Sequence, residues 1–323
     1  MIKIDQNNPF NALWNNGNAQ LNPNRDGILW ELARKVKNIV FYIPNSVIAA
    51  CINPRKESRF KPSIKLQANH GDFTKEIITP DQVHLTAHIH VKEEAAVNTP
   101  TVIMFNPLGA NDGVHSKLKD ELSKRNCNVV TFDYRGYGST RRAEDLVVDG
   151  ESVYQYVTKE LGIQSDKVHF YGYSLGGAIA AQVKALHPES AGKYVGDRPF
   201  RSVFSLITEK CCIEKLGCLI KKITSFISAI FIAYPVYLLG WEWDGSKALT
   251  QLKGDKRVVY HPNDWLIPCK ASLASLCPAD KRVSLNPKRI GPSTHFAPIG
   301  AQTMADGTPA VNAVVDFLTN NPS

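Results

Sequence analysis

Apolar runs alternate with helix-like segments through most of the chain after residue 75. Runs that fit buried strands occupy residues 101–105, 128–132 and 168–171, and segments of helical character separate them at 114–125 and 143–161. Further strands are expected at 75–78, 83–91, 200–207, 257–261 and 282–286, and a last helix at 309–318. Strands that alternate with helices through right-handed crossovers predict an α/β fold with a doubly wound, mostly parallel sheet. Its functional site is expected beyond the carboxyl ends of the strands.

A glycine-rich turn separates the run at 168–171 from a series of helix formers. The turn reads Gly-Tyr-Ser-Leu-Gly, with Ser174 between Gly172 and Gly176. A serine on so tight a turn has unfavourable backbone angles, and the flanking glycines let the strand and the helix pass closely enough to tolerate them. The backbone N–H of Leu175 would then lie at a helix N-terminus, where partial positive charge stabilises an oxyanion. The pattern predicts a nucleophile, and a plain strand-to-helix turn is the alternative.

A serine nucleophile needs a histidine that takes its proton. In this kind of fold the order along the chain is serine, acid, histidine, and three histidines follow Ser174. His187 ends a helix and His261 ends a strand, whereas His295 lies in a loop after the last strand, where the base is needed. We therefore predict that His295 is the base, and an ordinary surface-loop histidine is the alternative.

The acid that orients this histidine is expected at the carboxyl end of the preceding strand. Asp264 occupies that position after the run at 257–261. Its alternative role is to form a turn beside a proline and an asparagine. Asp280, in a loop, and Asp244, after an apolar insert, are the next candidates.

Five segments resemble, in the same order, the motifs of the α/β-hydrolase superfamily. They are the strand and oxyanion loop at 101–109, an Asp-x-Arg-Gly-x-Gly-x-Ser segment within 129–139, the nucleophile elbow at 172–176, the acid loop at 264–268 and the histidine loop at 294–296. The resemblance extends from about residue 85 to the C-terminus, and it implies the α/β-hydrolase fold. Arg135, in the second motif, is expected to pair with Asp133 or with a neighbouring loop.

The oxyanion loop departs from the family pattern. Asn106-Pro107 stands where the family usually has His-Gly, and Pro107 has no N–H to donate. In the family the second oxyanion donor is the amide that follows this dipeptide, which maps to Leu108. The loop is also similar to that of uncharacterised hydrolase-like proteins of Chlamydia and Legionella, some of which are candidate secreted effectors.

Two segments lie outside the regular alternation. Residues 1–80 are interpreted as an N-terminal extension, with a helix at 28–40, that packs on a hydrolase domain at 81–323. An insert at 208–250 has no charged residue from 223 to 241, which meets the length of roughly 18 residues that a membrane span requires. A span there would separate Ser174 from its proposed partners. We therefore expect a helical cap over the site, with membrane-surface contact as a compatible role and an apolar, acyl or lipid-like substrate.

Composition narrows the class of protein. The 323 residues, 43% of them hydrophobic, can bury one large core. The net charge of +8 comes from scattered Lys and Arg without a nucleic-acid-binding motif, so no nucleic-acid partner is expected, although a basic face toward anionic lipid or an acidic partner stays open. Seven cysteines without metal-ligand spacing indicate a reducing compartment. No phosphate loop or dinucleotide motif is found, so no cofactor is expected.

The N-terminus has no apolar core after a basic start, so a Sec-type leader is not expected. This favours a cytoplasmic protein, or one that is secreted into a host cell without such a signal.

Together these observations predict a serine hydrolase that cleaves carboxylic esters or thioesters with an apolar acyl group. Ser174 attacks, His295 transfers the proton, Asp264 orients His295, and the amides of Leu108 and Leu175 bind the oxyanion. An acyltransferase with the same triad is one alternative. A non-catalytic scaffold or bacterial effector that binds a host protein or a membrane is another. Because this fold hosts many chemistries, the sequence leaves these alternatives open.

Overall fold

The computed structural model describes residues 72–91, 99–110, 112–135, 140, 142–210, 233–238 and 240–319. Most of the predicted N-terminal extension lies outside these residues, with its expected helix at 28–40. The central part of the predicted cap, at 211–232, and the glycine-containing loop at 136–139 also lie outside them.

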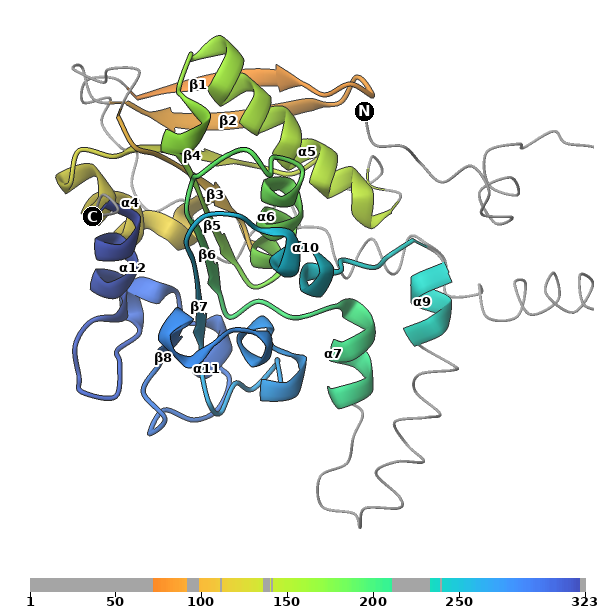
Figure 1. The fold of residues 1–323 in the computed structure, drawn as a ribbon, viewed down its shortest axis with the longest axis vertical. Helices are drawn as coiled ribbons and strands as arrows, with labels where there is room; N and C mark the ends of the chain where they lie inside the picture. Colours follow the sequence, from red (N-terminus) through yellow and green to blue (C-terminus); the bar gives the residue numbers. More distant parts are fainter. Residues whose placement is uncertain are drawn as a thin grey trace, which may run out of the picture. The chain divides into compact units, whose positions relative to one another are not determined.

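Among the described residues, eight strands form one sheet in the order β1-β2-β4-β3-β5-β6-β7-β8 (Figure 1). The strands are β1 (Asp72–Ile78), β2 (His84–His90), β3 (Thr101–Phe105), β4 (Asn128–Phe132), β5 (Val168–Tyr173), β6 (Tyr194–Asp197), β7 (Lys256–Tyr260) and β8 (Arg282–Ser284). β2 pairs antiparallel with β1 and with β4, and every other neighbouring pair is parallel. The predicted doubly wound, mostly parallel sheet is confirmed.

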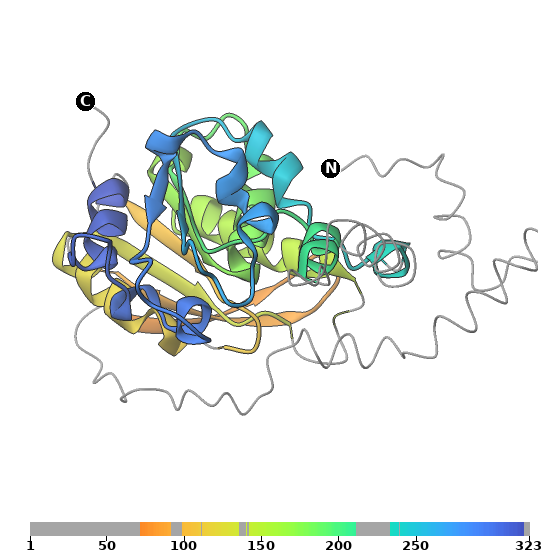
Figure 2. The same ribbon diagram turned by 90° about the horizontal axis from the view of Figure 1, so that it is seen from below.

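Helices cover both faces of this sheet (Figure 2). They are α4 (Ser116–Lys124), α5 (Ala143–Gln155), α6 (Leu175–Ala185), α7 (Val203–Lys210), α9 (Tyr234–Leu238), α10 (Gly245–Gln251), α11 (Ser293–Phe296) and α12 (Ala310–Thr319). α4 and α12 share one hydrophobic core with alternate residues of the strands, among them Val102, Tyr171 and Val195. On the other face Tyr154 of α5 stacks on Phe170 of β5. Strands covered on both faces are expected to be apolar throughout, and β3 and β4 are buried along their whole length.

The strand predicted at 200–207 is wrong, because that run forms helix α7 and the actual strand, β6, precedes it. Ser202 and Ser205 each accept a hydrogen bond from the other's backbone N–H, at 3.1 and 2.9 Å, as in a capping box. The carboxylate of Glu242 accepts further bonds from the first two N–H groups of α7, at 2.7 and 2.9 Å. A short apolar run fits a strand or a helix equally well, and here a distant carboxylate and two serines favour the helix.

The described ends of the predicted cap are helical. α7 leads into this region, and α9 and α10 follow it, with α9 in contact with α7. No helix in the described ranges has both the length and the apolar composition for crossing a membrane.

Candidate active site

Ser174 lies on a sharp turn between β5 and α6. Its φ of 53° and ψ of −117° fall where residues with a Cβ are rarely found. A Cβ on Gly172 would clash with the backbone of Gly176, and a Cβ on Gly176 would clash with the backbone of Phe105. The backbone N–H of Ser174 donates to the carbonyl of Asp197 at 2.8 Å, which ties the turn to β6. Both glycines are therefore needed for strand β3, strand β5 and helix α6 to approach so closely.

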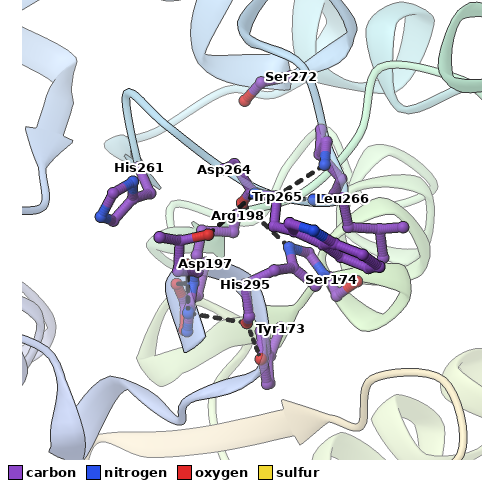
Figure 3. A network of polar contacts seen from close by, with 12 residues as sticks. Tyr173, Ser174, Asp197, Arg198, His261, Asp264, Trp265, Leu266, Ser272 and His295 are labelled. Atoms are coloured by element: carbon purple, nitrogen blue, oxygen red, sulfur yellow. Dashed lines mark hydrogen bonds and ion pairs between the residues drawn. The ribbon is translucent and has the colours of Figure 1, made fainter. Parts of the chain in front are cut away.

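Ser174, His295 and Asp264 form a continuous chain of hydrogen bonds (Figure 3). Ser174 Oγ lies 3.0 Å from His295 Nε2, and His295 Nδ1 lies 3.0 Å from Asp264 Oδ2. Ser174 comes from the β5–α6 turn, Asp264 from the segment after β7, and His295 from α11, a single helical turn where a loop was expected. Parallel strands bring these segments to one edge of the sheet, as the sequence order predicted.

Burial and backbone contacts hold the three side chains in place. The Asp264 and His295 side chains are 4% and 2% exposed. Asp264 Oδ1 accepts hydrogen bonds from the N–H groups of Leu266 and Ile267, at 2.9 and 2.8 Å, while Oδ2 faces the imidazole. Asp264 therefore forms the turn that was its alternative role, and its second carboxylate oxygen lies at the imidazole of His295.

The other candidates from the sequence are not members of this chain of hydrogen bonds. His187 pairs with Glu151 at 2.7 Å, and His261 is buried with its Nδ1 accepting from the N–H of Asn263 at 3.0 Å. Asp244 caps α10 by accepting from the N–H of Lys247 at 2.9 Å. Asp280 lies on an exposed single turn of 3-10 helix before β8.

Leu108 and Leu175, the predicted oxyanion donors, follow two neighbouring strands of the sheet, β3 and β5. Leu108 follows β3, which is hydrogen-bonded to β5, and Leu175 is the first residue of α6. Within the described residues neither backbone N–H donates a hydrogen bond. Asn106, which replaces the usual histidine, is buried and donates from Nδ2 to the carbonyl of Phe132 at 2.8 Å. Its side chain therefore fixes the loop to β4.

The sequence interpretation missed Arg198, which lies behind the histidine. Its guanidinium donates to both carboxylate oxygens of Asp197 at 2.8 and 2.9 Å, and from Nη1 to the carbonyls of residues 294, 295 and 297. Tyr173 donates its hydroxyl to the carbonyl of His295. Burial raises the pKa of the Tyr173 phenol, which keeps the hydroxyl protonated as a donor. The available signal was the Asp-Arg-Pro sequence that begins with the last residue of β6, but β6 itself was not predicted.

Arg135 serves another part of the fold. It donates from Nε to Asp149 of α5 at 2.8 Å and from Nη1 to Asp81 of the β1–β2 loop at 2.6 Å. A partner in a neighbouring loop was expected, whereas the bond to α5 was not. Within the described ranges, no group of three or more histidine, cysteine, aspartate or glutamate side chains is arranged to hold a metal ion.

Comparison with known proteins agrees with this architecture. Residues 100–210 match a family model described as the alpha/beta hydrolase fold. Protein bem46 of Schizosaccharomyces pombe is 26% identical over 41% of this chain and 46% of its own length. The alpha/beta hydrolase domain-containing protein WAV2 of Arabidopsis thaliana is 22% identical over 33% and 36%. The chain thus spans less than half the length of these two curated relatives.

A solved structure extends the match beyond the segment that the family model covers. The chain superposes on an esterase of Pyrococcus furiosus with a TM-score of 0.54 and 16% identity, over 82% of this chain and 98% of that one. Identity at this level shows the fold alone. By its sheet order, its elbow and these matches, the chain has the α/β-hydrolase fold, which confirms the fold that the resemblance to this superfamily implied.

Proposed function

We propose that this protein is a serine hydrolase that cleaves carboxylic esters or thioesters through an acyl-enzyme. The observation that carries the proposal is the chain of two 3.0 Å contacts from Ser174 through His295 to Asp264. The imidazole places one nitrogen at the hydroxyl and the other at a carboxylate. In this arrangement a histidine can take the serine proton while the carboxylate stabilises the imidazolium that forms.

In the proposed reaction Ser174 Oγ attacks the acyl carbonyl and its proton passes to His295 Nε2. The backbone amides of Leu108 and Leu175 donate to the oxyanion that develops. Collapse of this intermediate breaks the bond to the leaving group, which takes the proton from Nε2 as an alcohol or thiol. A water molecule then attacks the acyl-enzyme with His295 again as base, which releases the acid and restores the serine.

Exposed apolar side chains beside the reacting groups support an apolar acyl group. Trp265 and Phe296 are 48% and 50% exposed although their rings lie 5.9 Å apart, and Phe296 contacts the imidazole of His295 edge-on at 5.3 Å. Leu108, in the oxyanion loop, is 46% exposed. We call Leu108, Trp265 and Phe296 the apolar rim. An acyl chain that covered the rim would remove apolar surface from water, which stabilises its binding.

The proposal is tested by labelling the full-length protein with a fluorophosphonate probe. We expect mass spectrometry to find the label on Ser174, and we expect Ser174→Ala and His295→Ala to lose it. Ser272→Ala is the matched control, because Ser272 is also buried but accepts a bond from the N–H of Ala274 at 3.2 Å and is expected to be dispensable for labelling. Against nitrophenyl esters of graded chain length, Ser174→Ala should lower kcat by about a thousandfold or more.

The outcome also separates the alternatives. Hydrolysis of the longer esters at the highest rate supports the apolar acyl preference. Transfer of the acyl group to an added alcohol in place of water identifies an acyltransferase. Folded protein that the probe does not label contradicts the proposal and favours a binding role without catalysis.

A further inference from the structure

Arg198 is a buried cation that contacts no reacting atom but lies against the backbone of the base. Its side chain is 0% exposed. Nη1 donates to the carbonyl oxygens of Thr294, His295 and Ala297 at 3.2, 2.9 and 2.8 Å. Three carbonyls that point at one nitrogen would repel one another without a positive charge between them. The guanidinium therefore stabilises a backbone arrangement that these residues would not adopt on their own.

The other two nitrogens of the guanidinium bind the carboxylate of Asp197. Nε and Nη2 form a fork on the carboxylate of Asp197, and Tyr171 donates its hydroxyl to the same carboxylate at 2.9 Å. The ring of Tyr173 lies 4.6 Å from the centre of the guanidinium. A planar fork held by a carboxylate and an aromatic ring has little freedom to move.

The backbone of Arg198 is itself held in an uncommon conformation. Its φ is 50°, in the left-handed region that a long side chain rarely occupies. Its N–H donates to the carbonyl of Val259 in β7 at 2.8 Å, which fixes the residue between two strands. Conformations of this kind persist where the surrounding structure imposes them, and they are concentrated at functional sites.

From this network we propose that Arg198 is a positioning residue, which holds the backbone of His295 where Nε2 can reach the hydroxyl of Ser174. The helix that carries His295 has only four residues, Ser293–Phe296, so its own hydrogen bonds hold it weakly. Contacts from outside the helix must therefore set its position. The proposal rests on the proposed function for its catalytic consequence, whereas the holding of the backbone can be measured without any activity.

Arg135 provides a matched control for Arg198. Its side chain is 1% exposed and it also binds a fully buried aspartate, Asp149. The described partners of its guanidinium lie in α5 and in the β1–β2 loop, neither of which carries a residue of the triad. Removing either guanidinium therefore deletes a buried ion pair, but only one removal frees the histidine backbone.

The first test compares Arg198→Met, Arg198→Lys and Arg135→Met with the wild type. We expect Arg198→Met to lower kcat by about a hundredfold, because small displacements of a catalytic group cost that much, with little change in KM. Arg198→Lys should recover part of the rate, since an ammonium can reach a carbonyl but cannot form the fork on Asp197. Arg135→Met should lower Tm and leave kcat of the folded protein close to that of the wild type. Equal losses of kcat in the two methionine variants, at equal folded fraction, would overturn the proposal.

The second test measures hydrogen exchange of the backbone amides at 294–297, which are hydrogen-bonded to carbonyls of residues 291–293. We expect faster exchange there in both Arg198 variants and no change in Arg135→Met. Unchanged exchange rules out the holding role, whatever the enzyme hydrolyses. If Arg198→Met does not fold, Arg198→Lys decides both tests. If the wild type is not labelled at Ser174, the proposed function fails, and exchange still shows whether Arg198 holds this backbone.

Discussion

Strands β5 and β6 are hydrogen-bonded neighbours, and buried polar groups lie at both ends of this pair. The two ends differ in whether a buried charge has an opposite charge beside it. At the carboxyl ends, Asp197 and Arg198 form a buried ion pair with 2.8 Å between Oδ1 and Nε, next to Ser174. Burial disfavours the charge on Arg198, but the Asp197 carboxylate outweighs this effect and raises the pKa of Arg198. The charge at this end is retained and is bound to the backbone of the site.

At the amino ends the buried basic groups are bound mainly by backbone groups. Lys193 donates from its N–H to His169 Nδ1 at 3.0 Å and from Nζ to the carbonyl of Phe317 at 2.8 Å, and Lys184 donates from Nζ to the carbonyl of Ser190 at 3.2 Å. Burial, and then the charges of nearby lysines, lower the pKa of His169 to about 3. Burial lowers the pKa of Lys184 to about 8.

Buried polar groups therefore have different roles at the two edges of one sheet. The carboxyl edge uses paired charges to position groups, so substitutions there should reduce the rate more than the stability. At the amino edge, burial disfavours the charged forms of His169 and Lys184. Substitutions there should therefore change how stability depends on pH.

The largest effect is expected from Asp264→Asn at the carboxyl edge. An asparagine keeps the oxygen that accepts from the N–H groups of Leu266 and Ile267, so the turn and Tm should change little. Its amide cannot stabilise the imidazolium, and we expect kcat to fall by about ten-thousandfold in steady-state ester hydrolysis. Asp244→Asn, which also keeps a capping oxygen, is the control and should retain the rate of the wild type. If kcat of Asp264→Asn fell by less than tenfold, the paired charges at the carboxyl edge would not position the reacting groups.

The parts of the fold that the sequence predicts well are those with a local signal. Strands β3 and β4 were expected within the observed bounds, because strands buried on both faces are continuous apolar runs. Ser174, Asp264 and His295 were identified from chain order and from the strand ends that precede them, and the structure places them within hydrogen-bond distance.

The parts that the sequence did not predict depend on distant contacts. β6 has four residues, which include Gly196 and Asp197, so it lacks the apolar signal of a strand. The carbonyl groups that Arg198 binds lie 96 to 99 residues further along the chain. Likewise Glu242, which stabilises the start of α7, lies 38 or 39 residues from the groups that it binds. Neither set of contacts leaves a local pattern in the sequence, because both form only when parallel strands and their loops come together.

The next largest effect concerns acid stability at the amino edge. His169 binds a proton near pH 6.5 in the unfolded chain but only near pH 3 in the folded protein. The unfolded state therefore binds more protons between these values, and stability is lost as the pH falls from 6.5 toward 3, by about 5 kcal/mol at most. Urea unfolding of His169→Gln at a series of pH values should show a smaller loss. His84 is an exposed histidine of β2 that pairs with Glu76 of β1, and His84→Gln should leave the loss unchanged. A wild-type dependence of stability on pH in His169→Gln would contradict this role.

The smallest effect is expected from Lys184 at the same edge. Its pKa is about 8 in the folded protein and 10.5 unfolded, so the unfolded state binds more protons between these values. The contribution of this group to stability therefore rises with pH from 8 to 10.5, by about 3 kcal/mol at most, as the buried ammonium loses its charge. Urea unfolding of Lys184→Met should lack this rise. Lys117→Met, a change of an exposed lysine on α4, should retain the rise. If the rise persists in Lys184→Met, the buried ammonium of Lys184 is stabilised by the carbonyl of Ser190 and the nearby Glu189 as fully as Asp197 stabilises the charge of Arg198. Buried charges would then be equally well compensated at the two edges.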